Sequence, residues 1–285
     1  MKLLIYSKAL YSTWISYSPD TILFDAGKAA RSIMGNKSFA VERVFLSHGH
    51  TDHIAGLVGL VNIRNNAMGD KAKPLTIYYP KNNFHISELL NYLHRTNNNL
   101  SYPLEWVPLE SGDKVDVFRS PNSRNYRYLQ AFSTDHSKTE VSLGYNIVEV
   151  RQRLKAKYRN LTEETIAKKA EQGDREDLME SYDQKIFTYG GDSVPLNPKD
   201  IEETEILCHD STFLREEDRK EYKHATLEEA IEVARRAKVQ RELIAFHISS
   251  RYKNEVQKFE TKVREEEDLD CEVTLIQPGR IFSRE

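Results

Sequence analysis

Short apolar runs separated by polar or glycine positions make up the first 50 residues. Each run is rich in β-branched or aromatic side chains, which is typical of strands. The predicted strands cover residues 3–10, 13–18, 21–27 and 41–48. The apolar stretch at 54–63 and the segment 85–95 have helical patterns instead. The N-terminal part is therefore predicted to be a strand-rich layer with helices beside it.

The rest of the chain continues this mixture. Further strands are predicted at residues 74–80, 104–109, 114–118, 126–132, 141–150, 186–192, 205–210, 242–249 and 273–279. Residues 151–183 differ, because they are charged and favour helices. Two strand-rich halves flanked by helices are compatible with an α/β fold of the αββα sandwich type, in which helices cover two mixed β-sheets. The pattern does not fix the order of the strands.

Length and composition are those of a globular protein. The chain has 285 residues, of which 39% are hydrophobic and 30% charged. No Gly/Ser or Pro linker divides it, so we expect a single domain over residues 1–285. No apolar run reaches the ~18 residues that a membrane span needs. A net charge of −3 excludes a uniformly basic surface, so a nucleic acid would have to bind a local patch.

Cysteine use bears on the cellular compartment. Cys208 and Cys271 are the two cysteines of the sequence, and they lie far apart in it. The N-terminal residues have a strand pattern and no signal-peptide cleavage site. We therefore expect a protein of the reducing cytoplasm.

The strongest chemical signal is an H-x-H-x-D-H cluster directly after a predicted apolar strand. It consists of His48, His50, Asp52 and His53. Imidazole and carboxylate groups suit zinc and similar divalent ions. Alternate positions of an extended segment face the same side, so His48 and His50 can bind one ion while Asp52 and His53 serve a neighbouring one. An isolated histidine here would be an ordinary polar loop residue, but four ligand-type side chains in six positions favour a metal site.

This cluster resembles the signature of the metallo-β-lactamase superfamily, which includes lactamases, thioesterases and nucleases. The resemblance implies the metallo-β-lactamase αββα sandwich and further ligands after later strands. It assigns His48, His50 and His136 to one ion, Asp52, His53 and His247 to the other, and Asp192 to both as a bridge. Two divalent ions, which we expect to be Zn²⁺ with Mn²⁺ as the alternative, could share a hydroxide nucleophile for phosphodiester hydrolysis.

Three later stretches resemble the ribonuclease Z family within that superfamily. Residues 208–213, 224–226 and 247–252 correspond in order and approximate spacing to the H-E-A-T-F, H-S/A-T and H-I-S-S-R-Y pieces of that family. Short members of the family with a reduced basic arm resemble the chain along nearly its full length. The resemblance implies an endoribonuclease that cuts precursor tRNA on its 3′ side and leaves a mature 3′-OH end.

The same resemblance suggests which residues move protons. His224 comes just before the capping box at Thr226, and a helix N-terminus attracts anions. His224 could therefore contact the scissile phosphate, and the family assigns to it the protonation of the leaving 3′ oxygen. Asp210 and Arg251 are expected to orient His224. With Asp52 they complete the predicted catalytic residues.

The sequence departs from the family in three places. Asp210 stands where the family has Glu, and residues 7–13 replace a Gly-rich, Pro-containing loop whose contacts cannot be carried over. The long exosite arm of bacterial members is replaced by five basic residues at alternate positions: Arg151, Arg153, Lys155, Lys157 and Arg159. An extended chain would present all five on one face, so residues 149–186 are predicted to form a compact tRNA-binding arm. A solvated helical hairpin with ordinary surface charges is the alternative.

Two other functions remain open from the sequence. A thioesterase or lactonase could use the same ions on a carbonyl group, and a metal-stabilised RNA-binding module would need no turnover. The family resemblance also implies a homodimer, because the tRNA is far wider than the metal pocket. His85 and His94 lie in a predicted helix without ligand-type neighbours and are left out of the site.

Overall fold

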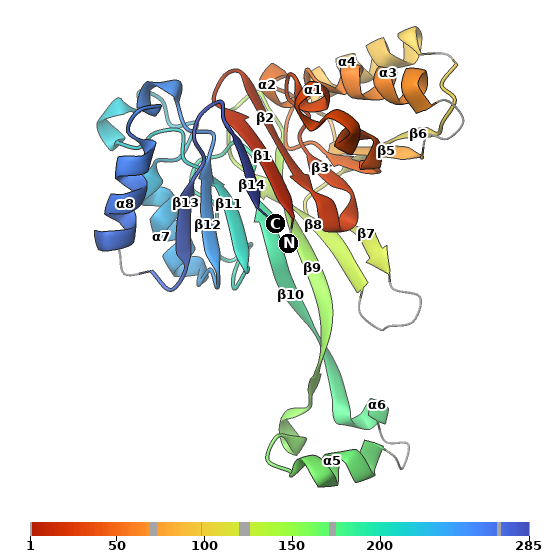
Figure 1. Cartoon of the computed structure of the whole chain (residues 1–285), viewed down its shortest axis with the longest axis vertical. Coiled ribbons are helices and arrows are strands. Elements are labelled where there is room, and N and C mark those ends of the chain that lie inside the picture. The colour runs from red at the N-terminus through yellow and green to blue at the C-terminus, as the bar shows by residue number, and fades with distance from the viewer. Residues whose placement is uncertain are drawn as a thin grey trace.

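Two β-sheets pack face to face in the computed structural model, and helices cover their outer faces (Figure 1). The structure describes residues 2–68, 73–97, 99–119, 126–170, 175–266 and 269–284. The predicted metallo-β-lactamase αββα sandwich is confirmed. No helix in these described ranges is both long enough and apolar enough to cross a membrane.

The first sheet has the strand order β14-β1-β2-β3-β4-β5-β6. Its strands are Leu3–Lys8 (β1), Ser12–Tyr17 (β2), Ile22–Phe24 (β3), Arg43–Phe45 (β4), Leu75–Pro80 (β5), Leu104–Leu109 (β6) and Ile281–Arg284 (β14). The strands β3 to β6 run parallel, whereas β14, β1, β2 and β3 alternate in direction. The sequence pattern did not predict β14, which is short and lies at the edge of the sheet beside β1.

The second sheet repeats this plan in the order β13-β12-β11-β10-β9-β8-β7. Its strands are Lys114–Arg119 (β7), Tyr126–Thr134 (β8), Ser142–Leu154 (β9), Met179–Tyr189 (β10), Ile206–Asp210 (β11), Glu242–Phe246 (β12) and Glu272–Leu275 (β13). Here β10 to β13 are parallel and β7 to β10 alternate. The strands β11 and β12 are buried along their whole length, which fits the apolar runs Ile206–Cys208 and Leu243–Phe246 within them.

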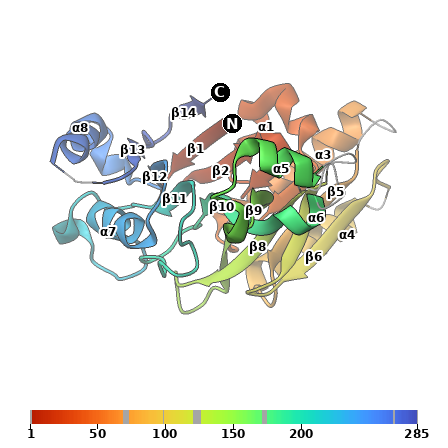
Figure 2. The same ribbon diagram turned by 90° about the horizontal axis from the view of Figure 1, so that it is seen from below.

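The helices cover the two outer faces (Figure 2). On the first sheet lie Ala30–Met34 (α1), Thr51–Ile54 (α2), Leu57–Met68 (α3) and Phe84–Thr96 (α4), and on the second lie Leu227–Ala237 (α7) and Val256–Glu266 (α8). The predicted capping box of α7 is present, since Thr226 accepts from the Glu229 amide and the Glu229 carboxylate accepts from the Thr226 amide. Between the sheets the core is mainly aliphatic and contains a cluster of aromatic rings, with Phe24 packed on Phe187 and Tyr189.

An arm projects from the sandwich where β9 and β10 continue as a two-stranded ribbon (Figure 1). The short helices Glu163–Lys169 (α5) and Arg175–Leu178 (α6) lie at its tip. Two expectations need correction. The arm is extended rather than compact, and β10 begins at Met179, inside the stretch that was predicted to be helical. Strand pairing along the ribbon overrides the helical preference of this charged segment.

The strand directions bring distant parts of the sequence to one edge of the sandwich. Because β8, β10, β11 and β12 run in the same direction, the residues that follow their C-terminal ends meet at that edge. His136 follows β8, Asp192 follows β10 and His247 follows β12. The H-x-H-x-D-H cluster follows β4 in the other sheet.

Candidate metal centre and cleft

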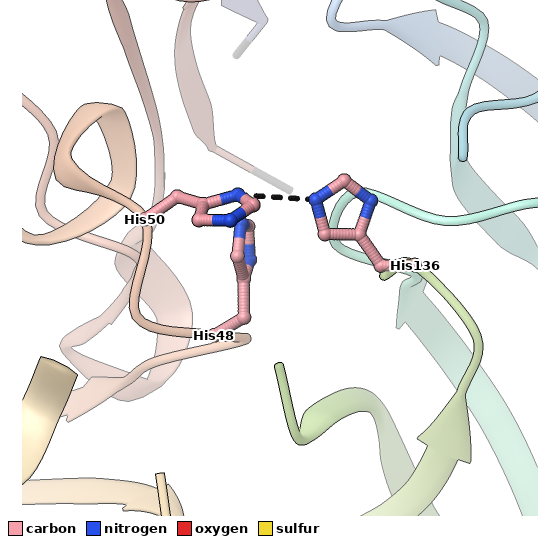
Figure 3. A group of neighbouring side chains, drawn as sticks. All are labelled: His48, His50 and His136. Carbon is pink, nitrogen blue, oxygen red and sulfur yellow. Dashed lines mark hydrogen bonds between the residues drawn. The ribbon is translucent and has the colours of Figure 1, made fainter. Parts of the chain in front are cut away.

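His48, His50 and His136 form one group of possible metal ligands (Figure 3). Their ligand atoms lie within 4.8 Å of one another, and His50 Nδ1 is 3.1 Å from His136 Nε2. Burial lowers the pKa of all three imidazoles, most strongly that of the completely buried His48. The neutral imidazole thus favoured is the form that binds metal.

Asp52, His53, Asp192 and His247 form the second group. Asp192 Oδ2 is 3.2 Å from His53 Nε2 and 3.1 Å from His247 Nε2. Burial raises the pKa of the Asp192 carboxyl, but His247 and His53 outweigh it and hold the pKa well below its ordinary value. Asp192 is therefore a carboxylate placed among imidazoles.

The buried atoms that lack partners test whether divalent ions fit this site. Among the described residues, His48 Nε2 and Asp192 Oδ1 are buried and have no hydrogen-bond partner. Such atoms normally cost free energy, because they give up hydration and gain nothing in return. Nitrogen and carboxylate donors are also the set that zinc and similar ions prefer. The residues therefore fit two ions, and the free Oδ1 is the atom of Asp192 available to the first group.

Asp25 supports the second group, and the sequence prediction missed it. It is fully buried, and its carboxylate accepts from the Ser47 amide, from the hydroxyl groups of Ser47 and Tyr189, and from His53 Nδ1 at 2.6 Å. This contact directs His53 Nε2 towards Asp192. The sequence showed only that Asp25 is a polar residue near the end of a predicted strand. Its contact with His53 depends on the pairing of β3 with β4, which the sequence pattern does not give.

Glu140 links the two loops that carry the first group. Its Oε2 accepts from the Gly49 amide at 3.0 Å and from Asn83 Nδ2 at 2.6 Å, and its Oε1 is 2.5 Å from His85 Nδ1. Gly49 lies between two of the ligands, and Glu140 follows the third by four residues. The Glu140 carboxylate therefore holds the loop of His48 and His50 next to the loop of His136. His85, left out of the predicted site, supports it indirectly.

We expect Glu140→Ala to weaken metal binding roughly 10- to 100-fold, the usual effect of removing a group that orients ligands. The substitution leaves the Gly49 amide without its acceptor and releases the loop of His136. Competition with a chromogenic chelator measures the affinity, and Glu110→Ala, at a half-exposed surface position, is the control. Equal affinities for Glu140→Ala and the unaltered protein would contradict this role.

The partly exposed His224 and the buried Asp210 form a pair beside the second group. His224 Nδ1 is 2.7 Å from Asp210 Oδ2, while Asp210 also accepts from the Ser193 and Thr212 amides. Burial lowers the pKa of His224, but Asp210 through its charge and hydrogen bond, helped by Asp192, raises it to about 9. The shorter Asp, which replaces the family's Glu, therefore still reaches the imidazole.

Arg251 does not have the expected position. Its guanidinium donates to Asp218 at 3.1 Å and lies near the rings of Phe213 and Tyr252. In the described ranges it makes no hydrogen bond or ion pair with His224. The prediction that Arg251 orients His224 is thus wrong, and the contact with the imidazole comes from Asp210 instead.

The two ligand groups and His224 open into one cleft of about 760 Å³. His50, Asp52, His136, Asp192, His224 and His247 all line it. The exposed side chains of Leu10 and Tyr222 lie at the same cleft. The arrangement can hold two cations, an anionic substrate and a proton donor in one place.

The five basic residues of the arm are not on one extended face. β9 ends at Leu154 and a 3₁₀ turn covers Ala156–Tyr158, so the alternation predicted from Arg151 to Arg159 is broken. Four of the five cations also have carboxylate neighbours: Arg151 with Glu149 and Glu205, Arg153 and Arg159 with Glu180, and Lys155 with Asp177. Lys157 lies over the Tyr158 ring. Much of the positive charge predicted for the arm is therefore compensated.

Known proteins similar to this chain agree in fold and in name. A model of the metallo-beta-lactamase superfamily matches residues 12–68. Ribonuclease Z of Thermococcus gammatolerans is 31% identical over 264 residues, which cover 84% of this chain and 78% of that relative. Ribonuclease Z of Gemmatimonas aurantiaca is 29% identical over 93% of this chain and 85% of its own length.

Solved structures give the same fold at lower sequence identity. The metallo-beta-lactamase fold protein YhfI from Bacillus subtilis has a TM-score of 0.65 and 16% identity, with 99% of both chains covered. A long form RNase Z from yeast has a TM-score of 0.60 and 15% identity, with 99% of this chain and 41% of the yeast chain covered.

Proposed function

The chain belongs to the ribonuclease Z family, and on this premise we propose that it is a metal-dependent endoribonuclease that cuts precursor tRNA on its 3′ side. The observation that carries the proposal is that members of both ligand groups line one cleft together with His224, which the buried Asp210 holds from behind. An RNA 3′ oxygen is a strongly basic leaving group and needs a proton. A thioester releases a weakly basic thiolate, for which a buried acid has little use.

The residues of this chain have distinct tasks in the proposed reaction. His48, His50 and His136 would hold one cation, Asp52, His53 and His247 the other, with Asp192 shared. When bound, the two cations lower the pKa of water and stabilise the charge that develops at the phosphorus. His224, held through Nδ1 by Asp210, presents Nε2 to the cleft and gives its proton to the leaving 3′ oxygen. The tRNA product keeps a 3′-OH end.

We propose Zn²⁺ as the physiological metal, with Mn²⁺ as the alternative. Five of the seven proposed ligands are imidazoles, which suit zinc well, whereas manganese favours oxygen ligands. Metal analysis of protein purified without added metal would distinguish the two ions.

The test of the function is to incubate Zn²⁺- or Mn²⁺-loaded protein with a 3′-extended precursor tRNA, with an Asp52→Ala protein and a thioester substrate in parallel. A discrete 3′ cut that disappears in Asp52→Ala supports the endoribonuclease. Thioester turnover with intact RNA would favour a hydrolase of the same fold. RNA binding by the metal-loaded protein without any cut would favour a binding module.

We also propose that the protein acts as a homodimer, in which the arm of one subunit holds RNA that the other cuts. The arm begins at the N-terminal end of β10, whereas Asp192 follows its C-terminal end. With 11 residues in β10, at ~3.3 Å per residue the two lie about 35 Å apart. An arm at that distance cannot close on its own cleft. Sedimentation of the purified protein tests the dimer.

Removal of the arm tests its role as the RNA-holding element. Leu154 and Met179 are paired across the ribbon, so a two-residue Asn-Gly turn can replace residues 155–178 without disturbing the sandwich. We expect the precursor tRNA concentration at half-saturation to rise roughly 10²-fold, as when a linked second binding element is lost. Hydrolysis of a nitrophenyl phosphodiester should persist, because the cleft is intact. An arm of ordinary surface charge would leave both measurements unchanged.

The cytoplasm is the proposed compartment. Both Cys208 and Cys271 are unpaired thiols in the structure, as expected in a reducing environment. Fractionation of the source cells tests this.

A further inference from the structure

A second pocket, of about 360 Å³, lies at the edge of the first sheet and has three cations around it. Lys8 ends β1, Lys253 follows the 3₁₀ turn Ser250–Tyr252, and Arg280 precedes β14. Tyr6, Ser250, Pro278 and Gly279 complete its lining. We call it the basic pocket. Three separate segments of the chain therefore bring like charges to one small cavity.

These three cations differ from those of the arm in having no carboxylate neighbours. Within the described ranges, no carboxylate oxygen lies within 4 Å of the charged groups of Lys8, Lys253 or Arg280. Lys8 instead lies over the Tyr11 ring, 3.8 Å from its centre. In a chain of net charge −3, three uncompensated cations around one pocket repel one another, and an anion would relieve this repulsion.

The basic pocket adjoins the metal centre. Ser7, the residue before Lys8, accepts a hydrogen bond from the His247 amide through Oγ at 2.9 Å. Its carbonyl accepts from the Gly279 amide, in the pocket wall, at 3.1 Å. Two residues beyond Lys8, Leu10 lines the cleft. One short segment therefore forms part of both cavities.

Ser250 adds a possible hydrogen-bond donor. Its hydroxyl oxygen is buried and has no hydrogen-bond partner among the described residues. Serine hydroxyl groups and cationic side chains are the groups that proteins use to bind phosphate oxygens. The pocket combines both, three residues after the metal ligand His247.

We propose that the basic pocket binds a backbone phosphate of the RNA, next to the phosphodiester that lies at the metal centre. The inference rests on the proposed function and adds an RNA contact that is separate from the arm. It also gives a role to the segment 7–13, where the family's usual loop is missing. Lys8 and Lys253 attract the phosphate as point charges, and the planar Arg280 can donate two hydrogen bonds to it.

The test compares Lys253→Glu/Arg280→Glu with a Lys258→Glu control in the metal-loaded full-length protein. Lys258 lies exposed on α8, outside the pocket lining. Single-turnover cleavage of a 3′-extended precursor tRNA is measured at several salt concentrations between 50 and 200 mM. We expect the double variant to need more enzyme for half-saturation. The slope of log affinity against log salt should fall by about one, because one phosphate contact is lost.

If the enzyme concentration at half-saturation and the salt slope are unchanged in the double variant, the proposal that the basic pocket binds an RNA phosphate is wrong. If the unaltered protein fails to cut the precursor at all, the proposed function is what fails. Lys253→Gln/Arg280→Gln removes the charge without adding a carboxylate, and it replaces the double variant if melting or metal analysis shows misfolding. Its expected change in salt slope is the same, and an unchanged slope would count equally against the proposal.

Discussion

An Asp192→Asn protein is expected to hold fewer than two metal ions per chain and to lose roughly 10³-fold in the cleavage rate of precursor tRNA. A single electrostatic contact in an active site contributes up to about that factor, and Asp192 faces both groups of ligands. Its Oδ2 lies among His53 and His247, and its negative charge also acts on His48. The amide keeps the shape and removes the charge.

Metal content per chain and the single-turnover rate are the two measurements for this variant. Asp116→Asn is a matched control, since Asp116 is exposed on β7 and contacts only Arg119 among the ion pairs of the described residues. If Asp192→Asn keeps two ions and the full rate, Asp192 does not bridge the metals. The assignment of seven ligands would then have to be changed.

His224→Ala is expected to lower the rate of RNA cleavage roughly 10²- to 10⁴-fold, the usual contribution of a positioned general acid. Metal content should stay at two ions, because the proposed ligands are untouched. A nitrophenyl phosphodiester releases a weakly basic leaving group that needs no proton. Its hydrolysis should therefore suffer much less than RNA cleavage.

This pattern separates two roles for His224. Asp192, Asp210, His224 and His247 also lie close enough together to hold an ion. If His224 were a ligand, both substrates would be affected equally and the metal content would fall. That outcome would refute the general-acid role.

The pH dependence carries the same argument further. The pKa of His224 is raised, to about 9, so its protonated acid form is present below that pKa and is lost as the pH rises through it. Bound cations near the ring would lower this pKa, and the Asp210 carboxylate opposes them. Asp210→Asn should therefore move the alkaline limb of the rate profile to lower pH. A limb that stays in place would show that another group titrates there.

Local sequence predicted most of the metal centre, because its chemistry is concentrated in a few residues. His48, His50, Asp52 and His53 are neighbours in the chain, and the three remote ligands follow predicted strands. The structure brings all seven into the two expected groups. Their roles as ligands remain predictions that the metal analyses will test.

Contacts that depend on the pairing of distant segments were missed. Asp25 reaches His53 only because β3 lies next to β4, and Glu140 meets Gly49 across 91 residues of sequence. Arg251 was placed by resemblance alone, and the nearby Asp218 holds it instead. A short edge strand such as β14 has too few residues to show a periodic pattern.

The position of β14 has a consequence for synthesis of the protein on the ribosome. Residues 281–284 pair with β1, so β1 is synthesised long before the strand that covers its edge. Until then β1 has an unpaired edge, which can pair with strands of other chains. The proposed ligand His247 and the wall of the basic pocket also come from this late part of the chain. A nascent chain that has not yet reached residue 247 therefore has an incomplete metal centre as well as an unpaired edge at β1.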